Sequence, residues 1–134
     1  MRAKFAVFAC VVGMILGTGS AIAHHSFAAE FDANKALTLK GIVTKIEWQN
    51  PHTYFYLDVP GPGSKVVSWG MEMASPNGLM RQGWTRNTLK VGDAVTVEGS
   101  QAKDGTNVGN ARVVILDATG QRLFAASSQT QTPQ

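Results

Sequence analysis

The sequence predicts an all-β protein: a small antiparallel barrel of about five strands, with one short helix between the third and fourth strands. Three observations favour this fold class. Short segments of alternating apolar and polar residues recur along the chain, clusters of Gly, Pro, Asn and Asp separate them, and a single segment carries the start signals of a helix. The 134 residues suffice for one domain with a modest core.

The amino-terminal segment has the pattern of a secretory signal peptide. Arg2 and Lys4 precede an uncharged, mostly apolar run over residues 5–16, and the segment ends in Ala-Ile-Ala at residues 21–23. The apolar run is too short and too rich in glycine to be a good membrane span. We therefore expect a signal peptide over residues 1–23, a periplasmic protein and no membrane association after cleavage; a retained anchor is the alternative.

Removal of that segment changes the charge balance. The 111 residues from His24 onward hold 10 basic residues against 9 acidic ones, so the mature chain is nearly neutral. Such a surface does not attract polyanions over long range, which argues against nucleic acid as a partner. The single cysteine, Cys10, lies inside the signal segment, so the mature chain has no disulfide, thiolate metal site or cysteine nucleophile.

The mature chain divides into three parts. Residues 24–36 form an amino-terminal arm in which Phe27 and Phe31 are four apart and can share one face of a helical turn. An irregular segment anchored by the two rings is the alternative. Residues 37–124 form the barrel domain, and residues 125–134 are a polar, low-complexity tail that we expect to be disordered.

The strands of the barrel follow from period-two patterns. In the first strand the apolar phase switches near Gly41, which predicts a bulge, or a coiled strand that passes between two faces of a barrel. The expected strands cover residues 37–48, 53–59, 65–73, 94–100 and 108–116, with residues 121–124 as a possible short addition.

One segment between the third and fourth strands predicts a helix. Ser75 is a good N-cap, Pro76 suits the first helical position and Gly83 can end the helix, which gives residues 76–82. Three strands, a helix and two strands is the order of an oligonucleotide/oligosaccharide-binding (OB) barrel, so we expect an OB-like fold. A different small barrel or an open sandwich is the alternative.

Several short motifs span the mature chain. They are His-His-Ser at 24–26, Phe-Asp at 31–32, Gly41 and Val43, Asn-Pro-His at 50–52, Trp69 and Glu72, Ser-Pro-Asn at 75–77 with Leu79, Gly-Trp at 83–84, Gly-Asp at 92–93 and Asp-Gly at 104–105. In these motifs the chain resembles a family of small exported bacterial proteins of unknown function. The resemblance implies an exported, OB-like protein and implies no reaction.

The three histidines suggest a metal site. Cleavage before His24 would expose an α-amine beside its imidazole, an arrangement similar to the histidine brace of some exported copper proteins. Such an amine titrates at about pH 8. His25 or His52 could supply a third nitrogen, and Glu72 or Asp32 a weak oxygen ligand. Nitrogen ligands suit Cu(II), with zinc behind it. The alternative is two unstructured terminal histidines and a turn residue.

A second set of residues suggests a binding face. Tyr54 and Tyr56 share one side of the second strand and could stack a ligand, as aromatic residues do on OB faces. Asn50 would lie at the rim, where turn formation explains it as well, and Trp84 belongs to the same aromatic-rich set of candidate ligand contacts. Glu72 needs a partner if it faces inward, from Arg81, Arg86 or a histidine; otherwise it is an exposed edge residue.

Catalysis has little support in the sequence. It contains no nucleophile elbow, no His-Glu-x-x-His metal motif and no phosphate-binding loop, so we do not expect an enzyme. Two hypotheses remain. The first is an exported binding module for a small ligand or an envelope protein, and the alternative is a copper-binding protein built on His24 with His25 or His52.

Overall fold

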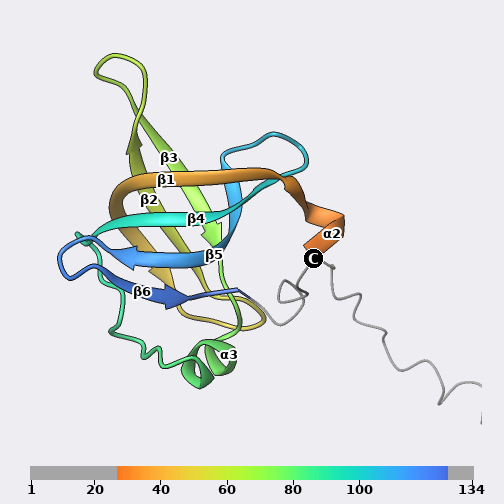
Figure 1. Ribbon diagram of the computed structural model, residues 1–134, viewed down its shortest axis with the longest axis vertical. Helices are drawn as coiled ribbons and strands as arrows, with labels where there is room; N and C mark the ends of the chain where they lie inside the picture. Colours follow the sequence, from red (N-terminus) through yellow and green to blue (C-terminus); the bar gives the residue numbers. More distant parts are fainter. Residues whose placement is uncertain (1–26, 127–134) are drawn as a thin grey trace, which may run out of the picture.

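Six strands and two short helices make up residues 27–126, the part of the chain that the computed structural model describes. The predicted signal peptide, His24 and His25 lie outside these residues. The elements, in chain order, are α2 (Phe27–Glu30), β1 (Phe31–Glu47), β2 (Tyr54–Pro60), β3 (Val66–Glu72), α3 (Pro76–Arg81), β4 (Ala94–Ala102), β5 (Val108–Leu116) and β6 (Gln121–Phe124) (Figure 1).

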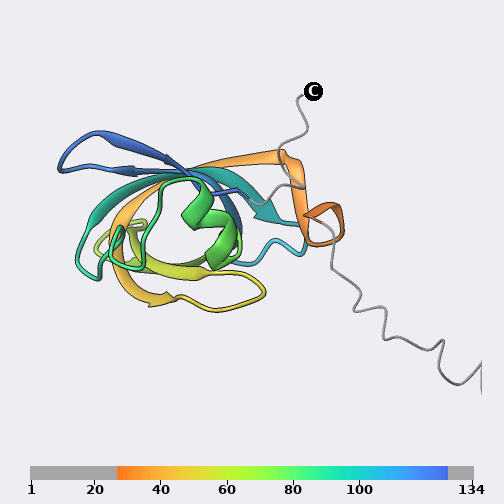
Figure 2. The same ribbon diagram turned by 90° about the horizontal axis from the view of Figure 1, so that it is seen from below.

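The strands form one closed ring. Their order is β3-β2-β1-β4-β5-β6, and a parallel pairing of Gly70–Glu72 in β3 with Val108–Asn110 in β5 closes the ring; the other pairings are antiparallel. The helix α3 connects β3 to β4 and lies across one end of the ring (Figure 2). The predicted small antiparallel barrel with a helix between the third and fourth strands is therefore confirmed.

The long first strand, β1, pairs with a different neighbouring strand at each of its ends. Its first part pairs with β4 and its last part with β2, and Ile42 pairs with both Ala94 and Asp58. Gly41 permits the close approach at this point, because a Cβ atom there would lie 2.3 Å from the backbone oxygen of Asp58. The strand that passes between two faces is confirmed, but its register shifts lie elsewhere, one of them between Val43 and Lys45.

The arm is shorter than predicted. We expected it to run to residue 36, but β1 begins at Phe31, which is buried and pairs with Ala102 of β4. The Phe27 and Phe31 rings stack with centroids 5.6 Å apart, which confirms that they share a face. The burial of Phe31 explains the early start, because strand pairing satisfies the backbone of a segment whose side chain enters the core.

The carboxyl-terminal boundary also differs from the prediction. Ala125 and Ala126, expected in a disordered tail, are buried. The Ala125 N–H donates to the carbonyl of Arg112, and its own carbonyl accepts from the Ala74 N–H, both at 2.8 Å. These backbone bonds attach the end of β6 to β5 and to the segment before α3, so the barrel extends two residues further than the polar composition suggests.

The helix α3 has the predicted cap. The Ser75 hydroxyl accepts a hydrogen bond from the Gly78 N–H at 3.1 Å, and Pro76 occupies the first turn. Its Leu79 enters the core among alternate residues of the strands: Val43, Phe55, Leu57, Met71, Val95, Val97 and Val114. No helix within residues 27–126 is long and apolar enough to cross a membrane.

Candidate functional site

Three polar side chains from three strands form a row on the outside of the barrel. Tyr54 of β2 pairs with Glu72 of β3, and Glu72 pairs in turn with Asn110 of β5. Directly paired residues project from the same face of a sheet. The neighbouring Phe55 and Met71 are in the core, so the three polar residues lie on the opposite, outer face.

His52 joins this row from the connection between β1 and β2. Its Nδ1 atom lies 3.0 Å from Oε1 of Glu72. The Tyr54 hydroxyl donates a hydrogen bond to Oε2 of the same carboxylate, and the Asn110 amide lies 3.5 Å from Oε1. We call these four residues, His52, Tyr54, Glu72 and Asn110, the Glu72 cluster.

The carboxylate at the centre of the cluster is almost fully buried. Glu72 is 5% exposed and Asn110 is 3% exposed, although both lie on the outer face. A buried carboxylate is costly unless it is hydrogen-bonded. Its three partners offset that cost, so Glu72 holds the side chains around it in a defined arrangement.

Tyr54 remains a neutral donor within this cluster. Burial raises the pKa of its phenol well above the ordinary value, and the hydrogen bond and negative charge of Glu72 raise it further. The negative charge of Glu30, at the end of α2, adds to the rise of this pKa. Tyr54 therefore donates to Glu72 at physiological pH.

His52 and Tyr54 are the two members of the cluster that are partly exposed to solvent. The His52 side chain is 32% exposed, and its Nδ1 atom is the one that faces Glu72. When Nδ1 carries the proton donated to the carboxylate, Nε2 carries a lone pair. A carboxylate behind one ring nitrogen is the usual arrangement of a metal-ligating histidine, because it fixes the tautomer and the ring orientation.

The described residues do not complete a metal site on their own. Within residues 27–126, no group of three or more His, Cys, Asp or Glu side chains could hold a metal ion. The Glu72 cluster contributes one histidine nitrogen and a carboxylate that is already shared among three partners. Any metal bound here needs further ligands, and the chain has two more histidines, His24 and His25, directly before α2.

Two other predicted ligand residues, Tyr56 in β2 and Asn50 in the connection before it, lie outside the Glu72 cluster. Tyr56 lies on the outer face with Tyr54, but its hydroxyl donates to Glu47 at 3.2 Å and the Lys45 ammonium lies 5.3 Å from its ring centroid. Its ring and its hydroxyl are thus already in contact with protein groups. Asn50 is exposed in the connection that carries His52.

Trp84 does not belong to the cluster. It is 2% exposed in the core, and its indole N–H donates to the carbonyl of Phe124 at 2.8 Å. This burial makes it a packing residue that connects the segment after α3 to β6, which corrects its prediction as a ligand contact. Of the partners predicted for Glu72, which were Arg81, Arg86 or a histidine, the structure shows the histidine, His52.

Asn110 was not recognised from the sequence. Its signal was its position inside a mostly apolar strand, because asparagine is depleted in strands and a buried amide needs partners.

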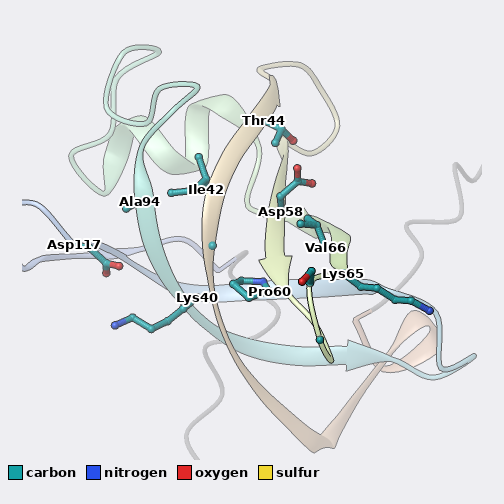
Figure 3. A pocket seen from close by; sticks show the side chains of 12 residues that line it. Lys40, Ile42, Thr44, Asp58, Pro60, Lys65, Val66, Ala94 and Asp117 are labelled. Carbon is teal, nitrogen blue, oxygen red and sulfur yellow. The ribbon is translucent and has the colours of Figure 1, made fainter.

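A separate hollow lies on the outer side of β1. It has a volume of about 560 Å³ and an apolar floor that includes the exposed side chains of Ile42 and Val66 (Figure 3). Two lysines and two aspartates line it: Lys40, Lys65, Asp58 and Asp117. Its lining includes neither a histidine nor an aromatic ring, so it lacks the groups that distinguish the Glu72 cluster.

Fold and site together define a small closed β-barrel that carries a carboxylate-bound histidine on its outer face. Residues 12–111 match a family of unknown function (DUF6152), and the chain belongs to this family. No curated protein matches the chain.

Proposed function

We propose that this protein is an exported binding module and that its ligand is Cu(II), bound through Nε2 of His52. The observation that carries the proposal is the contact between His52 Nδ1 and the buried carboxylate of Glu72. When Nδ1 carries the proton donated to that carboxylate, Nε2 of this 32% exposed side chain carries a lone pair. Imidazole nitrogen suits Cu(II), which also leads the divalent affinity order.

The remaining ligands would come from the amino terminus. Cleavage after Ala23 would make His24 the first residue, with both an α-amine and an imidazole to offer one metal ion. His25 is the alternative source of imidazole. Export is part of the proposal, and the intact mass of protein recovered from the periplasm should equal that of residues 24–134; a mass that includes residues 1–23 would contradict it.

Copper titration of three proteins tests the proposal. They are the mature protein beginning at His24, the same protein with one added residue before His24, and His52→Ala. We expect the mature protein to bind Cu(II) below micromolar, and both altered proteins to bind at least about tenfold more weakly, because each loses one ligand. Gln49→Ala, an exposed change in the same connection, is the matched control and should bind normally.

The pH dependence provides a second check. Binding requires a neutral amine and neutral imidazoles, so affinity should fall as the pH drops from 7 to 5. If the extended protein binds as tightly as the mature one, the amino terminus is not a ligand. If the mature protein does not bind Cu(II) below micromolar, the copper proposal is wrong.

A second candidate is a module that binds an uncharged small ligand or an envelope protein at the same face. The partial exposure of both His52 and Tyr54 beside each other favours it. A sugar is one class that an OB-like face can stack. Addition of maltotriose should then shift the NMR signals of His52 and Tyr54 in the mature protein, and unchanged signals would argue against a sugar.

A further inference from the structure

The hollow on the outer side of β1 has the size and the lining of a small-molecule site. Its volume of about 560 Å³ falls within the roughly 300–1,000 Å³ that is usual for ligand pockets. Such pockets are lined mostly by apolar side chains, with a few polar groups that orient the ligand. Here exposed aliphatic side chains surround a carboxylate in the same way (Figure 3).

Strand pairing places that carboxylate, Asp58, between two aliphatic walls of the hollow. Asp58 of β2 pairs with Ile42 of β1 and with Ser68 of β3. Pro60, two residues further along β2, pairs with Val66. Paired residues and alternate residues of a strand share one face of a sheet. This is the outer face, because Ile42 is 47% exposed and Val66 is 63% exposed, and both present aliphatic surface to the hollow.

The Asp58 carboxylate has no partner of its own. It is partly buried, and within the part of the chain that the structure describes neither a hydrogen bond nor an ion pair reaches it. The other carboxylate of the lining, Asp117, already accepts a hydrogen bond from the Thr96 hydroxyl at 2.9 Å. The side chains of Lys40 and Lys65 run to opposite sides, so their ammonium groups lie away from Asp58 (Figure 3). A partly buried carboxylate in this position favours a cationic donor beside it.

We propose that this hollow binds an amphipathic amine, a molecule with a protonated ammonium group on an aliphatic chain. The ammonium donates to the Asp58 carboxylate, and the chain lies on Ile42 and Val66. The charge-assisted hydrogen bond fixes the orientation, and removal of aliphatic surface from water adds affinity. The site is separate from the Glu72 cluster, because Tyr54 lies four residues before Asp58 on β2, a separation of about 13 Å. The inference therefore does not depend on copper binding.

Titration of isotope-labelled mature protein with hexylamine tests the proposal by NMR. At about pH 7 the amine is protonated, as a lysine side chain is. We expect saturable shifts of the backbone signals of Ile42, Asp58 and Val66 at about a millimolar, which suits a ligand of this size. Hexanol and hexanoate are the matched probes, because they keep the chain and replace the ammonium with a neutral or a negative group. Both should bind at least about fivefold more weakly.

Three variants separate the contributions to binding. Asp58→Asn keeps the size of the side chain and removes its charge, so hexylamine should bind at least about fivefold more weakly. Asp117→Asn is the matched control, because this carboxylate lies in the same lining but already has a partner, and hexylamine should bind it nearly as tightly as the unaltered protein. Ile42→Ala removes aliphatic surface and should weaken hexylamine and hexanol alike. Unchanged melting temperatures would show that these losses are not losses of folding.

Three results would overturn the proposal. The hollow is not an amine site if hexylamine at tens of millimolar causes no saturable shift around it. Asp58 is not the acceptor if Asp58→Asn and Asp117→Asn weaken binding equally. Tighter binding of hexanoate than of hexylamine would mean that the hollow takes anions through its lysines instead.

Discussion

The Nδ1 atom of His52 lies 3.0 Å from Oε1 of Glu72, a carboxylate that faces outward from the barrel and is nevertheless buried. This contact joins an irregular connection to the end of β3. It orients a ring that would otherwise be free to rotate.

Loss of the Glu72 carboxylate should destabilise the barrel. Glu72→Ala leaves the Tyr54 hydroxyl and the Asn110 amide without their acceptor, and each unsatisfied buried group costs about 1–3 kcal/mol. Glu72→Gln keeps an acceptor oxygen and should cost less. The free energy of unfolding in urea measures both. Glu98→Ala, which breaks an exposed pair with Arg122, should cost less than about 1 kcal/mol; an equal loss at the two sites would contradict the structural role of Glu72.

The Tyr54 phenol should resist ionisation. The chain has two tyrosines, so Tyr56→Phe leaves Tyr54 as the only one, and its absorbance at alkaline pH reports its titration. The pKa is raised in the folded state, so the stability from this hydrogen bond is complete below about pH 10 and is lost as the pH rises through the folded-state pKa. Glu72→Gln should lower the pKa only in part, because burial is its largest cause. Ordinary titration near pH 10 in the folded protein would refute the account of Tyr54.

Gly41 should tolerate no side chain. Gly41→Ala places a Cβ atom against the backbone oxygen of Asp58, so β1 and β2 must separate, at a cost of about 1–3 kcal/mol. Gly70→Ala is the comparison, because its Cβ would lie 3.2 Å from a ring carbon of Tyr56, and a side chain can shift more easily than a strand. Thermal unfolding should show the larger loss for Gly41→Ala; the reverse order would argue against the close approach.

The cap of α3 should contribute to stability as N-caps usually do. Ser75→Ala removes the acceptor of the Gly78 N–H and should cost about 1 kcal/mol. Ser68→Ala, an exposed change on β3, is the control and should be nearly neutral. Equal stability of the two variants would show that the cap does not stabilise the helix.

Local patterns were enough to predict much of the barrel. The strand Val108–Leu116 and the capped helix after Ser75 follow from residue alternation and capping, which depend on near neighbours. The start of β1 at Phe31 could not be predicted in this way, because it depends on pairing with Ala102, far along the chain.

The cluster was only partly predictable for the same reason. His52, Tyr54 and Glu72 could be named as candidates from residue type and position. Their convergence depends on the pairing of β2 with β3 and on the parallel pairing that brings Asn110 beside Glu72. Nothing in the local sequence indicates that an outward carboxylate at the end of β3 is buried.

We propose that Nε2 of His52 is a copper ligand, and electron spin echo spectroscopy of the Cu(II) protein can detect this ligand. This measurement detects the remote nitrogen of each bound imidazole. The account predicts that the mature protein loaded with one equivalent of Cu(II) shows the imidazole of His52, and that His52→Ala loses one imidazole from the spectrum and binds more weakly. An identical spectrum and affinity in His52→Ala would contradict the claim.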